Sequence, residues 1–169
     1  MMMVLVAVSA CGLSDGDRYD GEDFFHTGCA SETKAGLNGA ASELILEHTP
    51  KGLMVTRKNA EMNCAIKLDG IECEANVEGD AIGYYVHPKS EMSANCVCLV
   101  KEMLSTVTGL TEGNEYTLYY WCEGEGPLVP ISFTYAKGFR MVIDPDLFQA
   151  EIVDIGDGTW RPNVPYWWK

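Results

Sequence analysis

Short runs of alternating apolar and polar residues, separated by two-residue turns, constrain the fold of this chain most strongly. The runs cover residues 62–68, 71–77 and 82–86. Asp69-Gly70 stands between the first two, and this pair is typical of a type I′ hairpin turn because both positions need a positive φ. Gly79-Asp80 separates the second and third runs. Period-2 alternation is the pattern of a strand with one buried face, so the segment predicts a three-stranded antiparallel meander. Its buried face carries Cys64 and Cys73.

Further strands are expected on both sides of this meander. Apolar runs at 44–46 and 53–55 flank Thr49-Pro50-Lys51-Gly52, whose proline and glycine indicate a turn. Residues 116–122 and 129–135 supply two more strands. Residues 95–107 fit either a helical face or a strand, and the strand is favoured because its surroundings are sheet. About seven short strands with turns between them are typical of a β-sandwich.

The segment from Leu110 to Tyr116 adds a more specific expectation. A leucine, a tight turn and a tyrosine that opens a strand resemble the tyrosine corner of immunoglobulin-like and fibronectin-type sandwiches. The resemblance implies that the Tyr116 hydroxyl bonds to backbone near the turn. The predicted fold is therefore an all-β, antiparallel immunoglobulin- or fibronectin III-like sandwich, with a flexible N-terminal tether and an aromatic C-terminal extension.

The N-terminus predicts export. Residues 1–10 form an apolar run too short to span a membrane, and Val8-Ser9-Ala10 places small residues directly before Cys11. This pattern resembles the lipobox of bacterial lipoproteins, in which the cysteine is acylated. The resemblance implies that residues 1–10 are a signal peptide remnant and that Cys11 anchors the protein to a membrane. The alternative is a cysteine that follows small residues by chance.

The remaining chain divides into three parts. Residues 11–40 are expected to be a lipidated acidic tether, because residues 14–23 are rich in Asp and Gly and offer little to bury. The alternative is a weak divalent-cation site in residues 14–23, although their spacing does not match a calcium loop. Residues 41–136 are expected to form the sandwich, and residues 137–169 an extension that packs on it.

Charge and motifs exclude several functions. The 169 residues carry a formal net charge of −13, which disfavours nucleic acid and anionic lipid surfaces. The sequence contains no G-x-S-x-G, no phosphate-binding glycine loop and no H-E-x-x-H, and its three histidines are scattered. We therefore expect no catalytic residues and no cofactor.

The seven cysteines indicate an oxidising compartment or a metal. Without Cys11 six remain, a number that can pair. In the predicted hairpin Cys64 and Cys73 are diagonal neighbours about 7 Å or more apart, too far for a disulfide. The preferred pairing joins Cys64 and Cys73 each to one of Cys96 and Cys98. Cys29 and Cys122 then remain as a third pair.

Two alternatives to six paired cysteines stay open. Four clustered thiols from Cys64, Cys73, Cys96 and Cys98 could hold zinc, although a C-x₈-C and a C-x-C lack the usual C-x₂-C spacing. The cysteines could also be inert buried thiols.

The C-terminal extension ends in aromatic residues: Trp160, Tyr166, Trp167 and Trp168. Aromatic rings can stack on sugars, so these residues are candidates for glycan binding. The favoured interpretation is that they cover an open edge of the sandwich, where large rings bury the most area.

Several stretches together resemble a group of lipoproteins from gut-type Gram-negative (Bacteroidetes-like) bacteria for which no activity is known. The resemblance covers about residues 40–136 and is carried by these segments: Arg57 to Cys64, Glu78-Gly79-Asp80, Asn95 to Cys98, and Gly109 to Tyr116. It implies location and fold only: an exported β-sandwich protein, lipid-anchored at the outer membrane or cell surface. Together with the absence of catalytic motifs, this predicts a non-catalytic protein that binds a glycan or envelope protein or has a structural role. The alternatives are a carbohydrate-binding module that uses the C-terminal tryptophans and a zinc-binding envelope protein.

Overall fold

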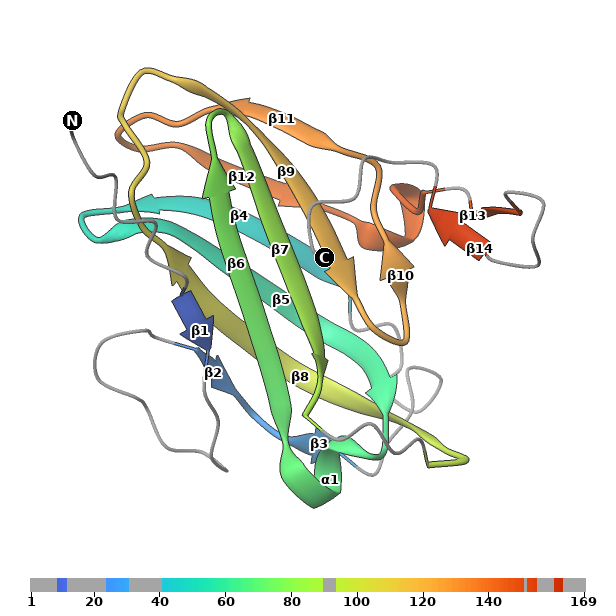
Figure 1. Ribbon diagram of the computed structural model, residues 1–169. Helices are drawn as coiled ribbons and strands as arrows, with labels where there is room; N and C mark the ends of the chain where they lie inside the picture. The colour runs from blue at the N-terminus through green and yellow to red at the C-terminus, as the bar shows by residue number, and fades with distance from the viewer. Residues whose placement is uncertain are drawn as a thin grey trace, which may run out of the picture.

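The computed structural model describes residues 9–11, 24–30, 41–89, 94–150, 152–154 and 160–162. Two β-sheets pack face to face around a single apolar core (Figure 1). The two-layer, all-β architecture predicted from the sequence is confirmed. Among the described residues, no helix is long and apolar enough to cross a membrane.

The first sheet, sheet A, has six strands. Their spatial order is β1 (Ser9–Cys11), β6 (Ile71–Glu78), β7 (Ala81–Pro88) and β9 (Glu115–Cys122), with β10 (Gly126–Pro127) and β11 (Ile131–Thr134) both along the far side of β9. The turn at Gly79-Asp80 joins β6 to β7, as predicted, and Gly79 has the positive φ of 63° that such a turn requires. Alternate residues of β6, β7 and β9 face the core.

The second sheet, sheet B, also has six strands. Their order is β12 (Arg140–Ile143), β4 (Glu43–Thr49), β5 (Gly52–Asn63) and β8 (Val97–Val107), followed by β2 (Phe25–His26) and β3 (Cys29–Ala30), which both pair with β8. The expected β4–β5 turn at residues 49–52 and the strand preferred over a helix at residues 95–107 are confirmed. A short two-stranded sheet contains β13 (Ile152–Asp154) and β14 (Trp160–Pro162).

One pair of neighbouring strands in sheet A is parallel. Strand β7 pairs with β9 in parallel register, because the chain leaves β7, crosses to sheet B as β8 and returns as β9. Immunoglobulin-type sandwiches are built from antiparallel sheets. The parallel pair is therefore a departure from the topology that the sequence predicts.

The predicted first hairpin of the meander is wrong. Residues Ile66–Asp69 form a single helical turn, α1, and Gly70 ends it at a φ of 90°. Strand β5 ends at Asn63, where the Asn63 side chain accepts a hydrogen bond from the Ala65 backbone N–H at 2.9 Å. The chain then passes from sheet B to sheet A through α1, so β5 pairs with β8 rather than with β6.

Strand β5 changes the face that it buries at Asn59. Before this residue Leu53, Val55 and Arg57 are buried at alternate positions, and after it Ala60 and Met62 are. Asn59 has a φ of 55°, a left-handed conformation that asparagine tolerates better than most residues. The change of phase leaves Arg57 as the last core-facing residue of the first half of β5.

The predicted boundary between tether and sandwich needs correction. Residues 24–30 were expected in a solvated tether, but β2 and β3 pair with β8 and Phe24 is buried in the core. Within the extension predicted at residues 137–169, β12 lies at the edge of sheet B and pairs with β4. The rest of the predicted tether, residues 12–23 and 31–40, lies outside the described residues.

The hydrogen bond predicted for the tyrosine corner is present. The Tyr116 hydroxyl accepts a hydrogen bond from the Thr111 backbone N–H at 2.9 Å, and the Tyr116 ring is buried. This contact fixes the turn that leads into β9.

Candidate functional site

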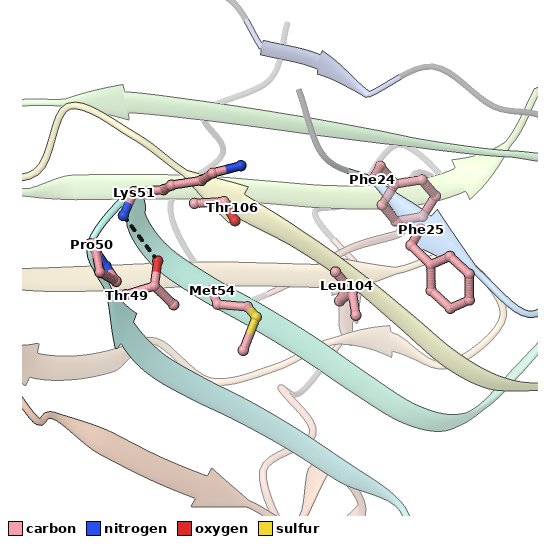
Figure 2. A pocket seen from close by; sticks show the side chains of 8 residues that line it. All are labelled: Phe24, Phe25, Thr49, Pro50, Lys51, Met54, Leu104 and Thr106. Carbon is pink, nitrogen blue, oxygen red and sulfur yellow. Dashed lines mark hydrogen bonds between the residues drawn. The ribbon is translucent and has the colours of Figure 1, made fainter. Parts of the chain in front are cut away.

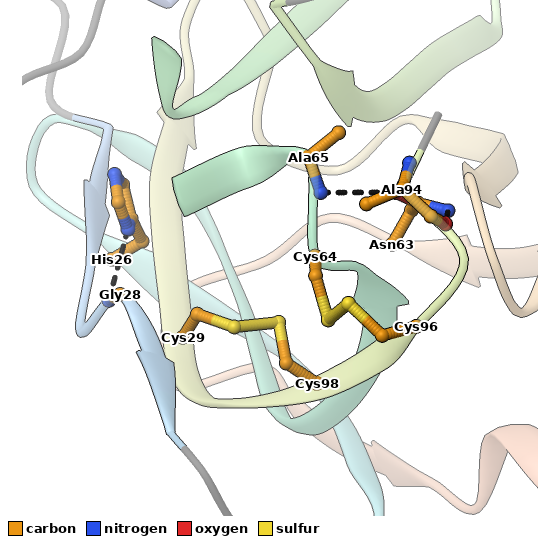
Figure 3. The surroundings of a disulfide bond; sticks show 9 residues. All are labelled: His26, Gly28, Cys29, Asn63, Cys64, Ala65, Ala94, Cys96 and Cys98. Atoms are coloured by element: carbon orange, nitrogen blue, oxygen red, sulfur yellow. Dashed lines mark hydrogen bonds between the residues drawn. A yellow bond between two sulfur atoms is a disulfide. The ribbon is translucent and has the colours of Figure 1, made fainter. Parts of the chain in front are cut away.

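The most concentrated chemistry lies at one end of the sandwich, where two disulfides lie next to each other (Figure 3). Cys29 in β3 is bonded to Cys98 in β8, and Cys64, just after β5, is bonded to Cys96, just before β8. The Sγ atoms of Cys29, Cys64 and Cys98 all lie within 4.8 Å of one another. The two bonds thus form one cluster of sulfur atoms, which we call the double disulfide.

The sequence predicted these bonds only in part. The Cys64–Cys96 bond is among the preferred pairings. The predicted bond of Cys73 with Cys96 or Cys98 and the predicted Cys29–Cys122 bond are wrong, because Cys29 is bonded to Cys98. The prediction failed because it placed residues 24–30 in a tether, when β3 in fact lies against β8.

Cys73 and Cys122 are free and buried in the core. In sheet A both lie in register with Val86, one on each side of β7. Strands two apart are separated by about 9.6 Å, twice the spacing of neighbouring strands, which is beyond the reach of a disulfide. Burial raises the pKa of the Cys122 thiol well above its ordinary value, and the nearby Glu125 carboxylate raises it further. Cys73 and Cys122 therefore fit the alternative in which the cysteines are inert buried thiols.

The predicted zinc ligand set is also corrected. Cys73 lies outside the sulfur cluster, and Cys29 takes its place beside Cys64 and Cys98. These thiols are close enough to share a metal ion in their reduced state, with Cys96 as the adjacent fourth sulfur.

A second polar site lies in the core between the sheets. The Arg57 guanidinium of β5 forms three hydrogen bonds with the Glu125 carboxylate, which lies in the turn between β9 and β10, at 2.6, 2.7 and 3.0 Å. The side chains of Arg57 and Glu125 are only 2% and 8% exposed. Glu125 also accepts a hydrogen bond from the Glu61 backbone N–H at 2.9 Å. This buried ion pair links the two sheets.

The surroundings of Arg57 keep it charged. Burial lowers its pKa, but Tyr120 and Glu125 outweigh burial and the pKa is raised from its ordinary value. The guanidinium donates further hydrogen bonds to the Ser42 hydroxyl at 2.7 Å and to the Glu43 carbonyl at 3.2 Å. Sequence analysis did not single out this pair, although a charged residue in phase with Leu53 and Val55 is a signal that could have identified it.

A shallow apolar hollow opens on the outer face of sheet B, beside the β4–β5 turn (Figure 2). Its volume is about 370 Å³. Residues in or next to β2, β4, β5 and β8 and in the turn line it: Phe24, Phe25, Thr49, Pro50, Lys51, Met54, Leu104 and Thr106. The lining is mainly apolar, so the hollow suits an aliphatic or aromatic group.

Aromatic side chains also gather on the outer face of sheet A. The Tyr85 ring stacks on His87 with ring centres 4.6 Å apart and contacts Trp121 of β9 at 5.1 Å. Carboxylates lie beside these rings, since the Tyr85 hydroxyl donates to Glu123 at 3.0 Å and His87 lies 3.5 Å from Glu74. The sequence prediction looked for such a platform at the C-terminus instead.

The other predicted site residues fall largely outside what is described. The backbone of Cys11 lies in β1, in register with Cys73 of β6. Trp160 begins β14, and Tyr166, Trp167 and Trp168 lie outside the described residues.

Comparisons add no relative from which a role could be transferred. No family model matches the sequence, no curated protein matches it, and no solved structure matches the fold.

Proposed function

We propose that this chain is an exported, non-catalytic module of the cell envelope, anchored through a lipid on Cys11 and acting as a binding or structural accessory at the outer membrane or cell surface. The observation that supports export is the double disulfide, because disulfides form and persist in oxidising compartments and are rare in reducing ones. Lipidation rests on the small residues that precede Cys11.

The hollow on sheet B supports the binding role. Its volume of about 370 Å³ falls within the usual range of ligand pockets. The tyrosine corner at Tyr116 supports an immunoglobulin- or fibronectin-like relationship, and the parallel β7–β9 pair argues against it.

Metabolic labelling tests the anchoring proposal. The full chain is produced in a Gram-negative host supplied with an alkyne-tagged palmitate, and the label is read after membrane fractionation. We expect label and membrane association in the wild-type chain and their loss in Cys11→Ser, while the buried-thiol control Cys122→Ser keeps both. An unlabelled chain in which Cys11 is disulfide-bonded to its register partner Cys73 would refute lipidation.

Carbohydrate binding is the second candidate, and the aromatic residues on the outer face of sheet A favour it. Tyr85, His87 and Trp121 combine ring surfaces with the adjacent carboxylates Glu74 and Glu123, the groups that stack on sugar rings and bond to their hydroxyls.

Affinity electrophoresis in gels that contain soluble β-glucan or mannan tests this second function. Retardation that is lost in Trp121→Ala but kept in Phe148→Ala, a change at an exposed aromatic residue elsewhere, would support it. Equal mobility with and without polysaccharide would count against it.

A further inference from the structure

The four cysteine residues of the double disulfide differ in their exposure to solvent. Cys96 is exposed and Cys29 is half-buried, whereas Cys64 and Cys98 are only 8% and 3% exposed. A thiol in solution therefore reaches Cys96 most readily. Exchange on this sulfur breaks the Cys64–Cys96 bond and leaves Cys64 as the departing thiolate.

The Cys64 sulfur would be released next to the second disulfide. Its Sγ lies within 4.8 Å of the Sγ atoms of both Cys29 and Cys98, so it can attack their bond after a small displacement. Attack on Cys98 expels the Cys29 thiolate, and attack on Cys29 expels the Cys98 thiolate. Cys29 is the better leaving group, because a half-buried thiolate is more stable than one at a 3% exposed position.

We propose that the double disulfide is a thiol–disulfide exchange relay that accepts electrons from an external dithiol at Cys96 and delivers them to Cys29. In the first step the external thiolate bonds to the Cys96 sulfur and the electron pair of the broken bond moves to Cys64. In the second step Cys64 bonds to Cys98, and the Cys29 thiolate takes a proton from water.

The second thiol of the external dithiol completes the reaction. It attacks its own sulfur in the mixed disulfide and releases Cys96 as a thiol. The dithiol becomes a disulfide by losing two electrons and two protons, and the chain keeps one bond, Cys64–Cys98, with free thiols at Cys29 and Cys96. The substrate class is an accessible dithiol of a peptide or small molecule, and this activity does not depend on lipidation of Cys11.

The exchange would also change the structure around β3. In the oxidised form the Cys29–Cys98 bond ties β3 to β8 alongside their register pairs Cys29 with Val100 and Ala30 with Leu99. After the relay this covalent tie between β3 and β8 is lost, because the new bond joins Cys64 to Cys98, while the backbone pairing of the two strands remains.

Disulfide mapping with glutathione as the external thiol tests the relay. The oxidised full chain is treated with reduced glutathione, quenched with acid at successive times, alkylated and analysed by peptide mass spectrometry. We expect glutathione on Cys96, a new Cys64–Cys98 bond and alkylated Cys29, with Cys29 appearing no earlier than the adduct on Cys96. Alkylated Cys64 with an intact Cys29–Cys98 bond would overturn the relay, and so would release of Cys29 before Cys96 is modified.

Variants separate the relay from direct reduction. Cys64→Ser removes the internal nucleophile, so release of Cys29 should slow at least about tenfold because a bimolecular attack replaces an intramolecular one. Cys96→Ser leaves Cys64 as a thiol and should contain Cys64–Cys98 bonds without added reductant. Cys73→Ser, at a buried thiol outside the cluster, should match the wild-type chain. Equal rates of Cys29 release in the wild-type chain and Cys64→Ser would refute the proposal.

Discussion

The Arg57–Glu125 ion pair gives the sharpest prediction about stability. Glu125→Gln keeps the size of the side chain but removes its charge, which leaves the Arg57 guanidinium at 2% exposure without a counterion. Removing one partner of a buried ion pair costs about 3–5 kcal/mol of the free energy of unfolding. With a urea dependence of about 2 kcal/mol per molar, the unfolding midpoint should fall by about 1.5–2.5 M.

Urea unfolding of the oxidised chain, followed by circular dichroism, measures this loss. Glu112→Gln is the matched control, because Glu112 pairs with His48 at 3.0 Å but is 60% exposed. An exposed pair contributes about 0–1 kcal/mol, so this control should change the midpoint little.

A double-mutant cycle separates the pair from its members. Arg57→Met combined with Glu125→Leu removes both charges together, and buried pairs replaced by apolar residues are often neutral or stabilising. We therefore expect the double variant to be more stable than either single variant. A cost below about 1 kcal/mol for Glu125→Gln would refute the reasoning, because it would show that the desolvation of Arg57 does not limit stability.

Three further predictions concern the turns and the core. Gly124→Ala should lower the free energy of unfolding by about 2 kcal/mol more than Gly138→Ala. Both glycines have a positive φ, but only at Gly124 would a Cβ atom meet another group, the Glu61 carbonyl oxygen at 2.9 Å, and equal unfolding free energies of the two variants would contradict this reasoning. Tyr116→Phe should lower the free energy of unfolding by about 1–2 kcal/mol, because the Thr111 N–H loses its acceptor, and an unchanged thermal midpoint would contradict it. The free energy of unfolding should fall as pH rises above the ordinary thiol pKa of 9.0, because the Cys122 thiol keeps its proton in the folded chain and loses it in the unfolded chain. Cys122→Ala should flatten this part of the curve of unfolding free energy against pH, and a slope identical to that of the wild-type chain would count against burial of the thiol.

The sequence predicted the fold best where the determinants are local. The turn at Gly79-Asp80 lies between two alternating runs, and its two strands pair directly. The Tyr116 contact with Thr111 spans five residues, so the local motif contains both partners. Such features need no knowledge of the second sheet.

The errors share one physical cause, which is contact between distant segments. Residues 62–68 alternate like a strand, but β5 finds its partner in β8, about forty residues later, and the chain must turn through α1 to reach the other sheet. The partner of Cys29 likewise depends on the docking of β3 against β8. Neither contact leaves a local signal.

The functional site follows the same division. The number of cysteines predicted cross-linking, and four of the six cysteines that were expected to pair form two disulfides. The buried pair of Arg57 and Glu125 was missed, because its residues are 68 apart and only the packing of the two sheets brings them together.

The pairing of β12 with β4 has a consequence for biosynthesis. Strand β4 pairs with β12, which comes about ninety residues later in the chain. A chain synthesised from its N-terminus therefore cannot complete sheet B until Ile143 has been made. The β6–β7 hairpin needs only local contacts and can form much earlier. A nascent chain therefore carries an open edge on β4 until β12 has been added, and an exposed edge strand of this kind can pair with another chain.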